Sequence, residues 1–305
     1  MKALQYKRDD RVRRTDTLNV KADHARRILF NRYSPFSVKE RARMLFSGAL
    51  DPAAGLQVVQ EHIRKDNKTD LKFFEVGPFK IFFYLKNNQD STFTLTDLCN
   101  AATANISSCF AMSNFLHKKV MASAGDVVFD LGANIGTESL MLSKIVGDKG
   151  KVFAFEPVTF DILRYNIEIN NIKNVEIVPA AISNVPGHTE IEIADRFLGS
   201  TIVRGSGPKQ QSSLVRVVPV TTIDDFCAYN KIERVDFVKM NVEGAEEAVL
   251  FGAMKTVKES CPKWSIASDH VDSRGEQQHP ALIKLLKAHN YTIFERPNAY
   301  IWAYK

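Results

Sequence analysis

The residues best suited to chemistry lie near the middle of the chain, in the segment Asp130-Leu-Gly132-Ala-Asn134-Ile-Gly136. Glycines at a turn between a strand and a helix allow a ligand to approach the backbone, and the N-terminus of a helix attracts anionic groups. A further carboxylate, that of Glu156, follows Gly132 by 24 residues, after the next apolar run. A carboxylate about 20 residues beyond such a turn can bind the hydroxyls of a ribose. The spacing therefore predicts a site for a ribose-containing cofactor.

The same segment discriminates between two classes of cofactor. Dinucleotide sites use the pattern Gly-x-Gly-x-x-Gly, in which the second glycine lets a pyrophosphate lie against the start of the helix. Here Asn134 occupies that second position, and Asp130 places a carboxylate beside the expected phosphates. Both features disfavour NAD and FAD, and both suit a ligand with one ribose, no phosphate and a positive charge. We therefore expect S-adenosylmethionine as the cofactor and S-adenosylhomocysteine as its product, with an NAD-dependent oxidoreductase as a minor alternative.

Methyl transfer to a hydroxyl requires a base, because the acceptor must lose a proton. His270 is the leading candidate, since it follows an apolar run at the expected ligand-binding edge and the usual pKa range of histidine suits proton transfer. Glu243 follows another such run and could hold the acceptor or act as the base. The alternatives are a surface-loop histidine and a helix-capping glutamate. Lys239 lies inside an apolar strand pattern and is expected to pair with a carboxylate. No cluster of His, Cys, Asp or Glu has metal-ligand spacing, so we expect no catalytic metal.

The elements that must position these residues alternate between strands and helices from residue 126 onward. Alternation of this kind predicts a doubly wound, mostly parallel α/β sheet, and a C-terminal hairpin would give it a reversed last strand. A β-rich insertion or mobile loop at about 182–220 interrupts the alternation. The expected strands are 127–131, 152–155, 175–179, 190–193, 215–219, 235–240, 263–267, 291–294 and 300–304, and the expected helices are 136–147, 159–171, 223–229, 246–258 and 279–289.

The composition divides the chain near residue 120, into an N-terminal α+β region, 1–119, and a cofactor-binding domain, 120–305. In the N-terminal region we expect a strand pair formed by 71–76 and 79–85 around Gly77-Pro78, because glycine and proline favour a turn. This region is expected to cap the cofactor site or to build the acceptor pocket. Its expected helices are 24–31, 38–47, 54–64 and 94–120.

The positive charge is concentrated at the start of the chain. The net charge is +6, yet residues 1–50 alone hold 13 Lys or Arg and 5 Asp or Glu, so the remainder is slightly acidic. A basic segment can bind nucleic acid, anionic lipid or an acidic sugar, and it can also be a solvated helical face. We favour the solvated face, because few aromatic residues accompany the charges and a base-stacking surface is not indicated.

The cysteine pattern and the hydropathy indicate the cellular compartment in which we expect the protein. The four cysteines, which form no Cys-x-x-Cys pair, are Cys99, Cys109, Cys227 and Cys261. They are expected to be reduced thiols in a cytoplasmic protein. No apolar run approaches the ~18 residues of a membrane-spanning helix, and no signal peptide is visible.

Five segments of the C-terminal part of the chain together form a recognisable set. They are Val128-Phe-Asp-Leu-Gly-Ala-Asn-Ile-Gly136, Val152-Phe-Ala-Phe-Glu-Pro157, Asn174-Val-Glu-Ile-Val-Pro-Ala-Ala181, Thr222-Ile-Asp-Asp225 and Val235-Asp-Phe-Val-Lys-Met-Asn-Val-Glu-Gly-Ala-Glu246. With them, roughly residues 120–304 resemble the FkbM-type family of S-adenosylmethionine-dependent methyltransferases. The resemblance implies a class I, Rossmann-like methyltransferase fold with a seven-stranded sheet, and methylation of a hydroxyl on a sugar, polyketide or other secondary metabolite.

The resemblance also implies roles for individual residues. Glu156, followed by Pro157, would bind the ribose, and Ala180 and Ala181 would lie beside the adenine. Asn241 stands where the family usually has an aspartate, which would remove a charge at the edge of the catalytic site. We expect it to orient the acceptor or the cofactor rather than act as a base. The residues that would line the methionine part are Asp130, Gly132, Ala133, Asn134 and Gly136.

The sequence thus predicts an S-adenosylmethionine-dependent O-methyltransferase acting on a small molecule or a glycan. Two alternatives remain open. One is a nucleic-acid methyltransferase that grips its substrate with the basic N-terminal segment. The other is a cofactor-binding protein without catalysis, which the asparagine at position 241 suggests. The identity of the acceptor and the oligomeric state are left open.

Overall fold

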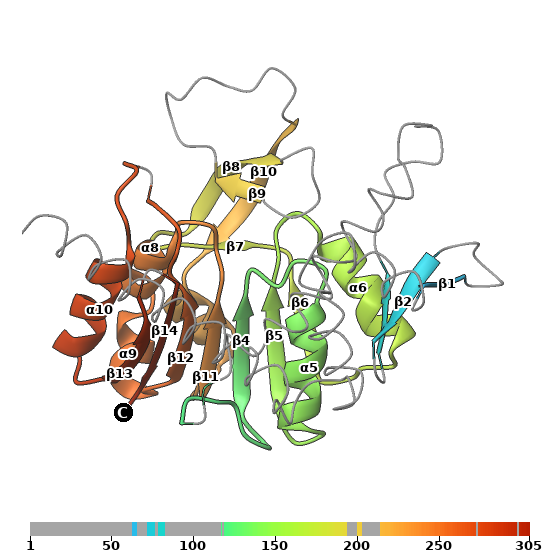
Figure 1. Cartoon of the computed structure of the whole chain (residues 1–305), viewed down its shortest axis with the longest axis horizontal. Helices are drawn as coiled ribbons and strands as arrows, with labels where there is room; N and C mark the ends of the chain where they lie inside the picture. The colour runs from blue at the N-terminus through green and yellow to red at the C-terminus, as the bar shows by residue number, and fades with distance from the viewer. Residues whose placement is uncertain are drawn as a thin grey trace, which may run out of the picture.

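The computed structural model describes residues 63–65, 72–76, 79–82, 117, 119–193, 200–202, 214–272, 274–297 and 299–305. Its centre is a seven-stranded sheet with the order β13-β14-β12-β11-β4-β5-β6 (Figure 1). Within it, β14 alone runs antiparallel to its neighbours. This confirms the doubly wound, mostly parallel sheet with a reversed last strand. The strands are β4 (Val127–Leu131), β5 (Lys151–Phe155), β6 (Val175–Val178), β11 (Phe237–Met240), β12 (Lys263–Ala267), β13 (Thr292–Arg296) and β14 (Tyr300–Tyr304).

Both faces of this sheet are covered, because successive strand side chains point to opposite sides. Phe129 and Leu131 join the apolar cluster formed with the helices of the C-terminal half. Val128 and Val152 join the cluster on the opposite face, where α5 packs. The central strands are therefore buried on both faces, as their continuous apolar runs predict. The helices are α5 (Thr137–Val146), α6 (Phe160–Ile169), α7 (Ile223–Asn230), α8 (Glu246–Phe251), α9 (Met254–Glu259) and α10 (His279–Ala288).

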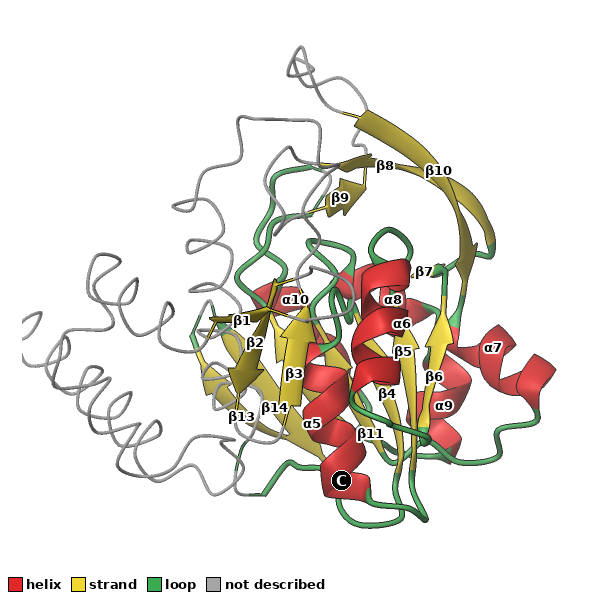
Figure 2. Ribbon diagram, turned by 90° about the vertical axis from the view of Figure 1, so that its right-hand side faces the viewer, coloured by secondary structure: helices red, strands yellow, loops and turns green. Residues whose placement is uncertain are grey.

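A second, four-stranded sheet has the order β7-β10-β8-β9. The strands expected at 190–193 and 215–219 are present in it, each somewhat longer than expected. Both views place β8, β9 and β10 beyond the carboxyl ends of β4 and β5 (Figures 1 and 2). The strands are β7 (Ala181–Ile182), β8 (Gly187–Ile193), β9 (Ser200–Ile202) and β10 (Leu214–Thr221).

The helix expected over 246–258 is instead two helices, α8 and α9, separated at Gly252-Ala253. Two contacts explain the break. A Cβ at position 252 would overlap the carbonyl oxygen of Ser183, so the chain approaches closely there. The carboxylate of Asp224 accepts hydrogen bonds from the backbone N–H groups of Lys255 and Thr256 at 2.8 and 2.9 Å, which caps a new helix start.

The N-terminal region contributes a small antiparallel sheet with the order β1-β2-β3. The pairing of Val76 with Phe79 confirms the expected turn at Gly77-Pro78 between β2 (Lys72–Val76) and β3 (Phe79–Phe82). The helix expected over 54–64 is wrong at its end, because 63–65 form β1 (Ile63–Lys65) and obtain their backbone partners from β2. His117 and Val120 form an isolated β-bridge rather than the end of a helix.

The other expected N-terminal helices and the basic segment lie outside the described residues. Among the helices that the structure describes, none is long and apolar enough to cross a membrane.

Candidate active site

The glycine turn follows β4 and has a backbone that only small residues tolerate. Gly132 and Gly136 have φ angles of +74° and +93°, in the left-handed region that glycine favours. A Cβ on Gly132 would overlap the carbonyl oxygen of Asn241, and one on Gly136 would overlap the side chain of Leu163. The two glycines therefore allow the turn to pack against the loop after β11 and against α6.

Glu156 lies directly after β5 and is tied to this turn. Its Oε2 accepts a hydrogen bond from the backbone N–H of Asn134 at 2.9 Å. Its Oε1 accepts from the backbone N–H groups of Val158 and Thr159 at 2.8 and 2.9 Å. Each carboxylate oxygen has two lone pairs, so Oε2 retains one that can accept a hydroxyl. The carboxylate is thereby fixed in place, and its binding of a ribose stays a prediction.

Asp130 is completely buried at the end of β4. Its Oδ2 accepts a hydrogen bond from Ser139 Oγ at 2.6 Å, and its Oδ1 lies 2.9 Å from Lys239 Nζ. Lys239 also donates to the carbonyl oxygen of Gly132 at 2.9 Å. The expectation that Lys239 pairs with a carboxylate is confirmed. Oδ2 of Asp130 is thus hydrogen-bonded, whereas Oδ1 is ion-paired with Lys239 but has no hydrogen-bond partner among the described residues, and contact of Asp130 with a cofactor stays a prediction.

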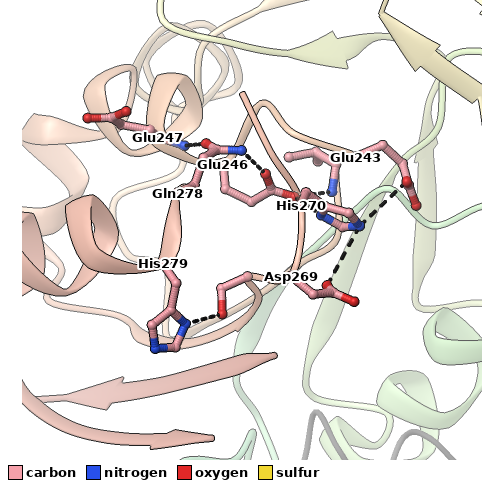
Figure 3. Close-up of polar contacts among 9 residues, drawn as sticks. Glu243, Glu246, Glu247, Asp269, His270, Gln278 and His279 are labelled. Carbon is pink, nitrogen blue, oxygen red and sulfur yellow. Dashed lines mark hydrogen bonds and ion pairs between the residues drawn. The ribbon is translucent and has the colours of Figure 1, made fainter. Parts of the chain in front are cut away.

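His270 lies between carboxylates at the same edge of the sheet (Figure 3). Its Nδ1 is 2.8 Å from Oε1 of the buried Glu246. Its Nε2 is 3.5 Å from Oε2 of Glu243 and 3.8 Å from Oδ1 of Asp269. The structure thus brings together the two residues predicted as base candidates, and it adds two acidic partners that sequence reasoning missed.

The charges around His270 determine its protonation. Burial alone would lower the pKa of His270, but the hydrogen bond to Glu246 and the charges of Glu246, Glu243 and Asp269 outweigh it and raise the pKa to about 9. Burial raises the pKa of Glu243 above its usual value, and the charge of His270 opposes that rise. Near neutral pH, His270 is therefore a cation beside Glu243.

Glu246, which lies closest to His270, is itself held by hydrogen bonds. Glu246 accepts hydrogen bonds from the backbone N–H of Val242 at 3.2 Å and, through Oε2, from Gln278 Nε2 at 2.8 Å. Gln278 in turn accepts a hydrogen bond from the backbone N–H of Glu247 (Figure 3). Both side chains are buried, so this network fixes the geometry of the His270 ring.

A second histidine supports the segment that carries His270. Ser268 Oγ lies 2.6 Å from His279 Nδ1, and His279 Nε2 lies 2.8 Å from Glu295 Oε2. Ser268 and His279 are buried, which ties the end of β12 to the start of α10 and to β13. Nothing in the sequence pattern singled out these contacts, because they join residues from three separate elements.

The backbone at Glu243 is unusual. Glu243 and Gly244 have φ angles of +52° and +101°. A left-handed conformation is uncommon for a residue other than glycine and is frequent at functional sites, where surrounding contacts maintain it. The turn presents the Glu243 side chain, which is 34% exposed, next to His270.

The remaining predicted residues lie around the same edge. The backbone N–H of Ala133 donates to Phe155, while that of Asn241 donates to Leu131. Ala180 is buried, and Ala181 begins β7 in the second sheet. Pro157 follows Glu156 and precedes α6. Their contacts with cofactor or acceptor stay predictions.

The donor set fits S-adenosylmethionine better than a dinucleotide. Glu156 supplies a fixed carboxylate for hydroxyls. The buried acidic side chain of Glu138 lies in the first turn of α5, the end of the helix against which a dinucleotide's pyrophosphate would have to lie. Within the described ranges, no group of three or more His, Cys, Asp or Glu side chains is arranged to hold a metal ion.

Two curated relatives are similar to parts of the chain. A probable cobalt-precorrin-6B C(15)-methyltransferase (decarboxylating) of Sulfolobus acidocaldarius is 34% identical over 79 residues, which are 25% of this chain and 41% of that protein. The 2-O-methyltransferase NoeI of Sinorhizobium fredii is 23% identical over 172 residues, 52% of this chain and 70% of that protein. The chain thus spans less than half the length of the archaeal relative.

Among solved structures, the methyltransferase FkbM from Methylobacillus flagellatus matches with a TM-score of 0.43 and 14% identity, over 86% of this chain and 60% of that one. Aeropyrum pernix fibrillarin in complex with S-adenosyl-L-methionine matches with a TM-score of 0.40 and 14% identity, over 79% of this chain and 97% of that one. The model of the methyltransferase FkbM domain matches residues 130–293, from the end of β4 to β13. That is more than half of the chain, and the protein therefore belongs to the FkbM methyltransferase family.

Proposed function

We propose that this protein is an S-adenosylmethionine-dependent O-methyltransferase whose acceptor is a hydroxyl of a sugar, a glycan or a secondary metabolite. The observation that carries the proposal is the partly exposed carboxylate of Glu243, held by the His270–Glu246 pair at the same sheet edge as the glycine turn and Glu156. A cofactor site and a positioned base are the two parts that methylation of a hydroxyl needs.

When bound, the cofactor supplies the methyl group on a cationic sulfur. The acceptor oxygen forms a bond to that carbon as the carbon–sulfur bond breaks, and the hydroxyl proton must leave. We assign Glu243 as the base that accepts this proton. His270 was the leading candidate from sequence, but a histidine with a pKa of about 9 already carries its proton near pH 7. Its charge then opposes the rise in the pKa of Glu243 that burial causes, and the ion pair orients the Glu243 carboxylate.

The acceptor class draws support from the relatives. NoeI, with which the chain shares 23% identity over 172 residues, is a 2-O-methyltransferase. A carboxylate base suits a hydroxyl acceptor, because removal of its proton assists attack by about 10²–10⁴-fold. The carboxylates of Glu243 and Asp269 also disfavour an acidic acceptor next to the reacting oxygen, since like charges repel.

Cofactor binding is tested first, by calorimetry with S-adenosylmethionine, S-adenosylhomocysteine and NADH. We expect both sulfur ligands to bind, NADH not to bind, and Glu156→Gln to weaken the two sulfur ligands. Binding of NADH without either sulfur ligand would overturn the cofactor assignment and restore the oxidoreductase alternative.

Catalysis is tested by formation of S-adenosylhomocysteine with neutral sugars, glycans and polyketide-like alcohols as acceptors. For an accepted substrate, Glu243→Gln should lower turnover by about 10²–10⁴-fold with little change in cofactor affinity. The matched control is Glu247→Gln, whose side chain points away from His270 (Figure 3). Cofactor binding without turnover on any acceptor would favour the non-catalytic alternative, and turnover on RNA would favour the nucleic-acid alternative.

A further inference from the structure

Glu138 is a buried carboxylate that the proposed chemistry has not used. It lies in the first turn of α5, two residues after Gly136, and only 9% of its surface is exposed. Apart from its own backbone N–H, no donor in the described part of the chain hydrogen-bonds this carboxylate. A buried carboxylate with so few donors around it is costly, so its place beside the glycine turn calls for an explanation.

Neighbouring charges show where the carboxylate lies. Burial is the main cause that raises the pKa of Glu138, while the charge of Lys239 lowers it and that of Asp130 raises it. Glu138 therefore lies within electrostatic reach of Asp130 on β4 and Lys239 on β11. The Lys239 ammonium lies 2.9 Å from both Oδ1 of Asp130 and the carbonyl oxygen of Gly132, so two of its three N–H donors are directed to those groups and not to Glu138.

We propose that Glu138 binds the α-ammonium group of the methionine part of the cofactor. The inference rests on the proposed function, since it takes S-adenosylmethionine as the ligand. An ammonium group brings three N–H donors and a positive charge, which are what this carboxylate lacks. The sulfonium brings charge but no donor. The methionine carboxylate would then face the N–H groups at the start of α5 rather than Glu138.

The test compares three ligands by calorimetry on the full chain. S-adenosylmethionine and S-adenosylhomocysteine both carry the ammonium, whereas 5′-methylthioadenosine lacks the amino-acid part. Glu138→Gln should weaken the first two by about 10- to 100-fold, because a charged hydrogen bond is lost, and should leave the third unchanged. The matched control is Glu168→Gln, an exposed glutamate on α6, which should alter none of the three affinities.

Proton release gives a second readout that a merely structural role would not produce. A cationic partner favours the ionised form of Glu138, so ligand binding at mildly acidic pH should release protons from the carboxyl. Calorimetry in two buffers of different ionisation enthalpy measures this release, and Glu138→Gln should reduce it. Glu138→Asp keeps the charge but shortens the side chain, and it should bind with intermediate affinity.

Three outcomes are distinguishable. Unchanged affinity of Glu138→Gln for S-adenosylmethionine would overturn the inference while leaving the proposed function intact. Equal weakening of 5′-methylthioadenosine would also overturn it, because the contact would not be with the amino-acid part. Failure of the unmodified protein to bind either sulfur ligand would instead overturn the proposed function. Thermal unfolding of each variant shows that the comparison is made between folded proteins.

Discussion

The ammonium nitrogen of Lys239 lies 2.9 Å from Oδ1 of Asp130, and the two side chains are 3% and 0% exposed. They face each other across β4 and β11, where the strand register pairs the two residues directly. The same ammonium group donates to the carbonyl oxygen of Gly132. This buried pair therefore fixes the glycine turn to the strand that leads to Glu243.

Removing one partner of this pair should be strongly destabilising. Asp130→Asn leaves the Lys239 charge buried with a weaker partner, and loss of one member of a buried ion pair costs about 3–5 kcal/mol. Chemical denaturation measures the free energy of unfolding. The control is Lys255→Met, which removes an exposed ion pair with Glu259 and should cost less than about 1 kcal/mol. Similar losses for the two variants would contradict the prediction.

Glycine 132 should tolerate no side chain. Gly132→Ala places a Cβ against the carbonyl oxygen of Asn241, whereas Gly147→Ala meets nothing within 4 Å. Both glycines have positive φ angles, +74° and +65°, so both variants carry backbone strain. Gly132→Ala should therefore lose about 1–3 kcal/mol more than Gly147→Ala in thermal or chemical unfolding, because of overpacking. Equal losses would show that the turn can move away from the loop after β11.

Stability should fall with rising pH through the titration of His270. Its pKa is about 9 in the folded protein, against about 6.5 in an unfolded chain, so its contribution is fully present below about pH 6.5 and is lost as the pH rises to 9. The groups that face it are Glu246, Glu243 and Asp269. We expect a loss on the order of 2 kcal/mol between pH 6.5 and 9.

Two measurements check this expectation. The imidazole resonance of His270 should titrate near pH 9 in NMR spectra. The pH dependence of unfolding should flatten in His270→Asn, while the exposed His188→Asn should leave it unchanged. An unchanged pH slope in His270→Asn would contradict the assigned charge state.

The start of α9 depends on a side chain from another helix. Asp224→Ala removes the acceptor for the backbone N–H groups of Lys255 and Thr256 and for the Thr256 hydroxyl. Loss of such a cap costs about 0.5–2 kcal/mol. Asp148→Ala, at an exposed turn, should cost less than about 0.5 kcal/mol. A loss for Asp224→Ala no greater than that of the control would show that α9 starts without this cap.

The sheet could be predicted from sequence because its strands are short apolar runs, and such runs report burial on both faces. The glycine turn and Glu156 were predictable for the same reason, since each follows directly after one of these strands. Glu156 proved to be bonded to the turn through the N–H of Asn134. The strands, the glycine turn and Glu156 could thus be predicted because each depends on residues that are neighbours in the sequence.

The network around His270 could not be predicted, because its members come from α8, the end of β12 and the residue before α10. Glu246 also begins a helix, and its position in the sequence gives no sign that its side chain is buried. The break between α8 and α9 was missed because Asp224 and Ser183, which determine it, are distant in sequence. Gly252 was the one local signal for that break.

The parallel pairing of β7 with β10, where the second sheet begins and ends, affects how the chain can change in length during evolution. Ala181 pairs with Val220 and Ile182 with Thr221, so the chain leaves and returns through one parallel pairing. Lengthening the segment between the paired residues raises the free-energy cost of closing the loop only slowly, by about 0.6 kcal/mol for each doubling of its length. Such lengthening also leaves β6 and α7 in place. The segments between Ile182 and Val220 can therefore change in length during evolution without disturbing the sheet that carries the glycine turn and Glu156.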